Sequence, residues 1–191
     1  MKQFLESPHL LQTIAEESEK NSETARQLVA GLRKEQLNWT SDLAKWSMAQ
    51  CLDHLATTSR QFGPYLTAAT ARGRQKWPVK ERVPYRPTWV GGWLVKQVMP
   101  ETQRTLPAPK VFRPSQSTIN GALERFLKQQ SAFLEFVRQA EGLDYNKTCL
   151  RSPVTPLLRY SLADAFVVTV LHGQRHLGQA RRMRETAGFP G

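Results

Sequence analysis

The sequence has no long apolar run. Its 191 residues are 40% hydrophobic and 23% charged, an ordinary balance for a globular protein. No stretch approaches the roughly 20 apolar residues that a membrane-spanning helix requires, so we expect no membrane span. Residues 1–18 also lack the apolar core, followed by small residues, that marks a secretory signal. We therefore expect a cytoplasmic protein.

Cysteine is scarce. The only two are Cys51 and Cys149, which lie far apart and form no CxxC pair. In a reducing cytoplasm this pattern is more typical of two buried or idle thiols than of a disulfide or a nucleophile.

Acidic residues are outnumbered by basic ones. The chain has 27 Lys and Arg against 16 Asp and Glu, a net charge of +11. Between residues 72 and 113, ten basic residues accompany two acidic ones, so most of the excess lies in one segment. Such a segment can attract an anionic partner such as nucleic acid, although net charge bears on association rather than on fold.

Helical periodicity, capping residues and glycine stops predict four long helices. We place them at about residues 7–32, 47–71, 117–141 and 161–187. Ser47 and Ser161 each begin a capping box, and Gly63-Pro64 is expected to kink or weaken the second helix. Gly142 and Gly188 are expected to follow the ends of the third and fourth helices.

The segment between the second and third helices holds seven prolines, too many for a continuous helix. We interpret residues 1–191 as one all-α domain, a four-helix bundle with a long crossover formed by a basic, proline-rich insertion at about 73–116. Residues 88–99 within the insertion are apolar enough for a packed turn of helix or a lid. Trp77, Trp89 and Trp93 resemble a base-stacking platform, but their aliphatic neighbours favour burial.

Three histidines are candidate metal ligands. His172 and His176 are four residues apart, a spacing that places both imidazoles on one helix face. This pair alone is a weak signal. His54 strengthens it, because an imidazole among Leu52, Leu55 and Ala56 would be unfavourable to bury without a partner. His9, near the N-terminus, is expected at the surface.

Three neutral imidazoles suit Zn(II), Ni(II), Fe(II) or Cu(II) better than Mg(II) or Ca(II), which prefer oxygen ligands. The residues do not choose among these ions, and zinc or nickel, with iron next, is our working expectation. Three protein ligands also leave a coordination position open, as in catalytic zinc sites, where bound water is acidified or a substrate thiolate binds.

These motifs resemble the DinB/YfiT-like family of four-helix-bundle metalloenzymes. The resemblance covers about residues 10–186 and depends on Trp46-Ser47 followed by His54-Leu55, on the PKVFRP stretch at 109–114, and on HGQRHLGQ at 172–179. It implies a metal held by His54, His172 and His176, and a homodimer. Members with known activities include thiol S-transferases that use mycothiol or bacillithiol, and a maleylpyruvate isomerase, so a low-molecular-weight thiol is a possible cofactor. The family name implies no DNA-repair chemistry.

Other residues near the histidines are weaker candidates. Gln50 and Gln179 could face the metal or hold a ligand imidazole, although a capping role is favoured for Gln50. Asp53 is expected to point away from His54, and Asp164 is explained by its cap. Arg175 is next to a candidate ligand and could meet an anionic substrate. Exposure to solvent is the commoner outcome for an arginine, and we expect it here. We assign no acid or base.

Two functions are compatible with the sequence. The first is a metal-dependent enzyme, a hydrolase or thiol S-transferase, that activates water or a thiolate against a small substrate. The second is a non-catalytic metal-containing protein that binds an anionic partner through its basic insertion; nucleic acid is the less favoured partner.

Overall fold

The computed structural model describes residues 1–42, 45–102, 107–114, 118–155 and 157–191. Within these ranges the chain is mostly helical, with one short antiparallel pair of strands. The elements in chain order are α1 (Lys2–Leu5), α2 (Leu10–Val29), α3 (Lys34–Asn38), α4 (Met48–Lys76), α5 (Trp89–Val98), η1 (Lys110–Phe112), α6 (Ala122–Gln139), β1 (Cys149–Arg151), β2 (Arg159–Ser161) and α7 (Leu162–Arg184).

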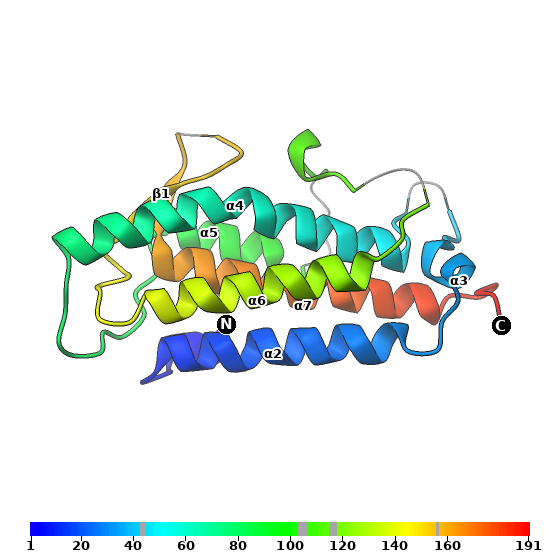
Figure 1. The fold of residues 1–191 in the computed structure, drawn as a ribbon, viewed down its shortest axis with the longest axis horizontal. Coiled ribbons are helices and arrows are strands. Elements are labelled where there is room, and N and C mark those ends of the chain that lie inside the picture. The colour runs from blue at the N-terminus through cyan, green and yellow to red at the C-terminus, as the bar shows by residue number, and fades with distance from the viewer. Residues whose placement is uncertain (43–44, 103–106, 115–117, 156) are drawn as a thin grey trace.

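The long helices of the described chain, α2, α4, α6 and α7, lie side by side as a bundle (Figure 1). Helix α4 packs against α7, α6 packs against α2, and α4 and α6 pack against each other. In Figure 1, α2 and α7 run in one direction and α4 and α6 in the other. The second and third long helices are therefore parallel and joined by a crossover, as the sequence predicted. We call residues 77–121, which connect α4 to α6, the crossover segment.

The capping boxes predicted for two of these helices are present. The Ser47 hydroxyl accepts a hydrogen bond from the Gln50 amide at 3.1 Å, and the Gln50 side chain accepts one from the Ser47 amide at 3.0 Å. Ser161 and Asp164 make the same reciprocal pair at 3.0 and 3.1 Å. These bonds satisfy amides that the first helical turn leaves without partners. They fix the starts of α4 and α7, and thus the heights of the histidines along the bundle.

Helix α4 continues through Pro64 and ends at Lys76, beyond the end predicted near residue 71, so Gly63-Pro64 does not terminate it. A proline inside a helix leaves the carbonyl four residues earlier without its helical partner. Here that residue, Arg60, and Pro64 itself are both exposed. Water can therefore satisfy the carbonyl, and the helix does not have to end.

Other helix limits also differ from the prediction. Helix α2 begins at Leu10 rather than near Ser7, and α1 precedes it as a separate turn. The predicted start of the third helix at Ser117 lies outside the described residues, and α6 is helical from Ala122. Helix α3 and the β1–β2 hairpin were not predicted. No helix in the described ranges is long and apolar enough to cross a membrane.

The core centres on α7. Phe166, Val167, Val170 and Leu171 are almost completely buried, and the Phe166 ring meets Phe133 of α6 edge to face, with centroids 5.6 Å apart. Helices α2, α4 and α5 all pack against α7. Burying such side chains stabilises the fold by about 1.5–3 kcal/mol each. Polar residues in the middle of α7, including its histidines, are thereby drawn into the interior.

Helix α5 attaches the crossover segment to α7. The buried carboxylate of Asp164 accepts hydrogen bonds from the Tyr85 hydroxyl at 2.8 Å and the Thr88 hydroxyl at 2.7 Å. Gly91 allows this approach, because a Cβ atom there would lie 2.0 Å from the Asp164 carboxyl carbon. Asp164 therefore anchors the crossover segment in addition to capping its own helix.

The expectation that the tryptophans of the insertion are buried is wrong. Trp89 is 86% exposed, and Trp93 and Trp77 are 44% and 43% exposed. Helix α5 is amphipathic: Gly91 and Val95 face the bundle, so Trp89 and Trp93, one turn apart, share the outer face. The neighbouring aliphatic residues do fill the core, but on the opposite side of the helix.

Candidate metal centre

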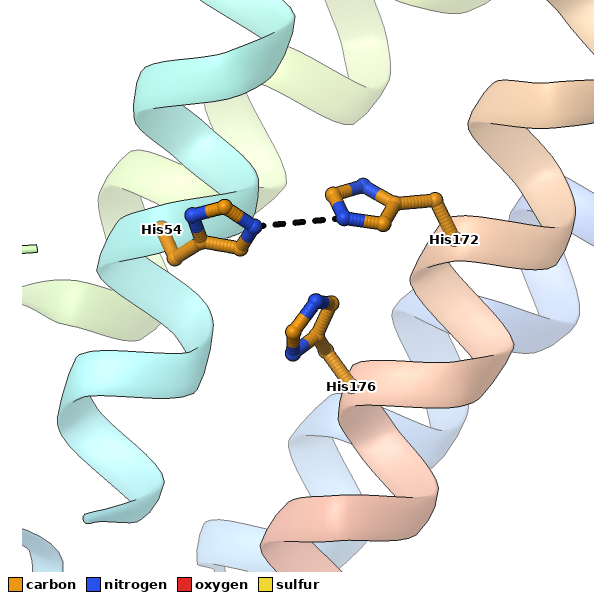
Figure 2. Close-up of side chains that lie close together, drawn as sticks. All are labelled: His54, His172 and His176. Atoms are coloured by element: carbon orange, nitrogen blue, oxygen red, sulfur yellow. Dashed lines mark hydrogen bonds between the residues drawn. The ribbon is translucent and has the colours of Figure 1, made fainter. Parts of the chain in front are cut away.

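The three candidate histidines come together between two helices. His54 extends from α4, and His172 and His176 extend from successive turns of α7 (Figure 2). One nitrogen from each ring can be chosen so that all three lie within 4.8 Å of one another. The rings point toward a common centre in Figure 2. Residues separated by more than a hundred positions in the sequence therefore form one cluster.

One pair of nitrogens has the spacing of two ligands on one ion. His54 Nε2 and His172 Nε2 are 3.2 Å apart. Two imidazole nitrogens bound about 2.0–2.1 Å from the same ion would be separated by roughly 3.0–3.4 Å. This pair thus has the separation of two ligands on a single small cation, and His176 provides a third nitrogen within 4.8 Å.

The crossover segment fixes the orientation of His54. His54 Nδ1 lies 2.6 Å from the carbonyl oxygen of Phe112, the last residue of η1. Because a carbonyl can only accept, Nδ1 carries the proton and the lone pair is on Nε2, which faces the cluster. The Phe112 ring is held in turn by Phe62 of α4, with stacked centroids 6.2 Å apart. Backbone support of this kind orients metal-binding histidines in many proteins.

Gln179 supports His176 as the Phe112 carbonyl supports His54. Its Oε1 lies 3.1 Å from His176 Nδ1, one turn later on α7. A proton on Nδ1 leaves the lone pair of Nε2 available to a metal. Gln50 instead lies at the start of α4 in the capping box described above. The structure places Gln179 against a candidate ligand and gives Gln50 its capping role.

Trp46 closes one side of the cluster. Its ring lies 4.7 Å from His54 and stacks on His176 with centroids 5.5 Å apart. The role of Trp46 was not predicted, although the residue belongs to the Trp46-Ser47 motif. The carbonyl of Phe112 was also missed, since a backbone contact leaves no mark on residue type. Both lie in stretches that carry the family resemblance.

Burial keeps the three imidazoles neutral. It is the largest cause lowering the pKa of His54, and it lowers that of His176 to about 3. The pKa of His172 is well below its usual value because of burial, and because a proton on its ring would be repelled by a proton on His176 or His54. His54 and His176 are buried, whereas His172 keeps part of its surface exposed. Neutral rings offer lone pairs, so this donor set suits a borderline transition-metal ion.

No carboxylate of the described chain joins this cluster. Asp53, adjacent to His54, forms an ion pair with Arg125 of α6 at 2.9 Å. Arg175 was expected to be exposed, but it is partly buried and donates to the Met99 carbonyl beyond α5 at 2.9 Å. It therefore contributes to holding the crossover segment. Three histidines without a protein carboxylate leave coordination positions open.

The remaining candidates lie elsewhere. His9 is exposed and contacts Arg82 beside an open hollow of about 500 Å³ at the start of α2. Cys51 is free and buried, which raises the pKa of its thiol to about 12, and Cys149 is free and partly buried. A thiol with such a high pKa is protonated at neutral pH and is a poor nucleophile.

Comparison with protein families gives one match. A sequence profile described as the DinB superfamily matches residues 18–180, most of the chain and all three histidines. Comparisons with curated proteins and with solved structures gave no match.

Proposed function

The chain belongs to the DinB superfamily, and from this premise we propose that it is a metal-dependent enzyme acting on a small substrate. His54, His172 and His176 would hold one divalent transition metal, zinc or nickel before iron. A metal in such a site lowers the pKa of bound water or binds a substrate thiolate, chemistry suited to a hydrolase or a thiol S-transferase.

One observation carries the proposal: three neutral imidazoles converge, and two are oriented from behind. The Phe112 carbonyl and the Gln179 amide hold Nδ1 of His54 and His176, so the lone pairs of both rings face inward. In a metal site the outer ring nitrogens have hydrogen-bond partners and the inner nitrogens gather at one point. Ordinary buried histidines do not typically show this arrangement.

The surroundings of the cluster favour a small substrate. His54 and His176 are buried between α4 and α7, Trp46 covers one side, and only His172 is partly exposed. A small molecule, or a low-molecular-weight thiol that presents its sulfur, fits this access better than a polymer. We further propose that the protein acts as a cytoplasmic homodimer, as the family resemblance implies.

Metal analysis tests the proposal. The full-length protein, reconstituted and desalted, should retain close to one transition-metal ion per chain by elemental analysis. His54→Ala and His176→Ala should each reduce that content severalfold or more, whereas His9→Ala, which removes an exposed histidine, should not. Wild-type protein that stays metal-free after reconstitution would show that the proposal is wrong.

A second function, binding of an anionic partner through the crossover segment, is favoured by a different observation. Trp89 and Trp93 are exposed on the outer face of α5, and the surrounding sequence is strongly basic. Exposed aromatic rings among cations are features of single-strand binding surfaces. Retention on single-stranded or duplex DNA should then fall steeply as salt is raised. No retention at low salt would eliminate this function.

A further inference from the structure

Two hydroxyl groups in α4 are buried without a hydrogen-bond partner in the described structure. They are Oγ1 of Thr58 and Oγ1 of Thr70. Buried hydroxyls are normally paired, because burial removes the water that would otherwise bond to them. Each of these atoms therefore lacks the partner that a buried hydroxyl normally has, and the described polypeptide does not provide one.

Other threonines on helices show how such a hydroxyl is usually satisfied. Thr67 in α4 donates to the Gly63 carbonyl at 3.1 Å, and Thr169 in α7 donates to the Ala165 carbonyl at 2.8 Å. This bond to the carbonyl four residues earlier is open to any helical threonine. Thr58 does not make it to His54, although His54 is four residues earlier on the same helix.

Position distinguishes the two unpaired hydroxyls. Thr58 follows His54 by one turn, about 40° around the helix axis, so the two side chains share a face. Phe62, one turn further along that face, packs on Phe112, whose carbonyl holds His54. Thr70 lies roughly 24 Å from His54 along the axis. Of the two, only Thr58 is within one helical turn of a candidate metal ligand, whereas Thr70 is more than four turns from it.

The charge of the centre indicates what a ligand there would be. A divalent ion on three neutral imidazoles keeps its full charge of two, and no carboxylate of the described chain joins the cluster to offset it. A site of this kind favours an anionic ligand. A threonine hydroxyl one turn away can donate a directed hydrogen bond to such a ligand.

We propose that Thr58 is a ligand-binding residue whose hydroxyl donates a hydrogen bond to a small anion, an oxygen, nitrogen or sulfur donor, at the open coordination position of the histidine centre. This inference rests on the proposed function, since it requires a metal on the three histidines. It assigns the site to anionic ligands that present an acceptor on the Thr58 side. Neutral ligands without an acceptor there would gain nothing from the hydroxyl.

Azide binding to the cobalt-substituted protein tests this role. Full-length wild type, Thr58→Val, Thr58→Ser, Thr57→Val and Thr70→Val are loaded with Co(II), and azide affinity is followed by visible absorption. Thr58→Val, which replaces the hydroxyl by a methyl group, should weaken azide binding about tenfold, as expected for a lost hydrogen bond to an anion. Thr58→Ser should bind azide within about twofold of wild type, since it keeps the hydroxyl.

The controls separate this inference from the proposed function. Thr57→Val changes the neighbouring threonine, which is also about one turn from His54 but on the other side of it, about 100° from Thr58 around the helix. Thr70→Val removes the distant unpaired hydroxyl. Neither should alter azide affinity. Wild type that fails to bind cobalt refutes the proposed function and this inference with it. If Thr58→Val binds cobalt normally and its azide affinity is unchanged, the inference alone is refuted. The same holds if Thr58→Ser weakens azide binding as much as Thr58→Val does, or if Thr58→Val loses its cobalt while wild type retains it.

Thermal melting of the metal-free variants guards against a folding artefact. Removing an unpaired buried hydroxyl should leave the midpoint of Thr58→Val at or above that of wild type, as for Thr70→Val. A midpoint lowered by Thr58→Val but not by Thr70→Val would show that the hydroxyl has a structural partner in the native protein, and would contradict the proposal.

Discussion

The histidine centre and the crossover segment are built in opposite ways. The centre lies inside the bundle, where packed helices surround neutral imidazoles, and hydrogen bonds hold two of the three rings from behind. Helix α5 of the crossover segment covers the outside of the bundle and exposes Trp89 and Trp93, while Val95 packs into the core and Asp164 accepts a hydrogen bond from Tyr85 just before the helix. The centre is polar and enclosed, whereas α5 has one apolar face packed on the bundle, one face in water, and a buried carboxylate that anchors its start. The two regions should therefore respond differently to pH and to mutation.

Acid should affect the centre most strongly. The pKa values of His54, His172 and His176 are lowered in the folded protein, so the unfolded chain binds more protons below its ordinary histidine pKa of about 6.5. Stability is fully present above that pH and is lost as the pH falls toward the folded pKa values. For the metal-free protein we expect a loss of up to about 1.4 kcal/mol per pH unit for each histidine.

Urea unfolding of metal-free protein between pH 7.5 and 4.5 measures this loss. His176→Gln should reduce the number of protons taken up on unfolding by about one, because one buried base is removed. The free energy of unfolding should then fall less steeply with decreasing pH. A stability that is flat across this range would contradict the buried, neutral state of the centre.

Removing the carboxylate of Asp164 should have the next largest effect. Asp164→Ala deletes the acceptor for Tyr85 and Thr88 of the crossover segment and for the Ser161 amide. We expect a loss of about 3–4 kcal/mol in the free energy of unfolding, because buried donors remain unpaired. Urea denaturation measures it, with Ser161→Ala as the comparison. That variant loses only the cap and should cost about 1 kcal/mol.

The two adjacent glycines of α5 provide a sharper test of the same attachment. Gly91→Ala would place a Cβ atom against the Asp164 carboxylate and should destabilise the protein by about 1–3 kcal/mol. Gly92→Ala meets no heavy atom within 4 Å and should stabilise it by about 0.5–1 kcal/mol, the helix-propensity difference. Thermal melting of both variants decides the point. Equal shifts in the melting temperatures of the two variants would mean that Gly91 does not pack closely against Asp164.

The outer tryptophans should contribute least to stability. Trp89→Ala should change the free energy of unfolding by no more than about 0.5 kcal/mol, since most of the ring is already in water. Val95→Ala, at a position on the same helix that is 1% exposed, should cost about 1–3 kcal/mol. Chemical denaturation of both variants compares the two faces of α5. A large loss in Trp89→Ala would indicate that this face is covered in solution.

The same contrast explains what could be predicted from the sequence. The bundle and the starts of α4 and α7 follow from periodicity and capping boxes, which are local signals. The three histidines were identified by spacing on one helix and by family resemblance. By contrast, the outward face of Trp89 depends on how α5 docks, and Arg175 turns inward because carbonyls near the end of α5 lie beside it. Tertiary placement of this kind has no signature within a short stretch of residues.

The bond from His54 to the Phe112 carbonyl has an evolutionary consequence. A main-chain oxygen is supplied by every amino acid, so this contact can survive substitution at position 112 as long as the backbone keeps its path. Insertions and deletions near η1 would displace the oxygen and leave His54 Nδ1 unpaired. In related chains, selection on this part of the centre should therefore act on the length of the loop more than on its residue types.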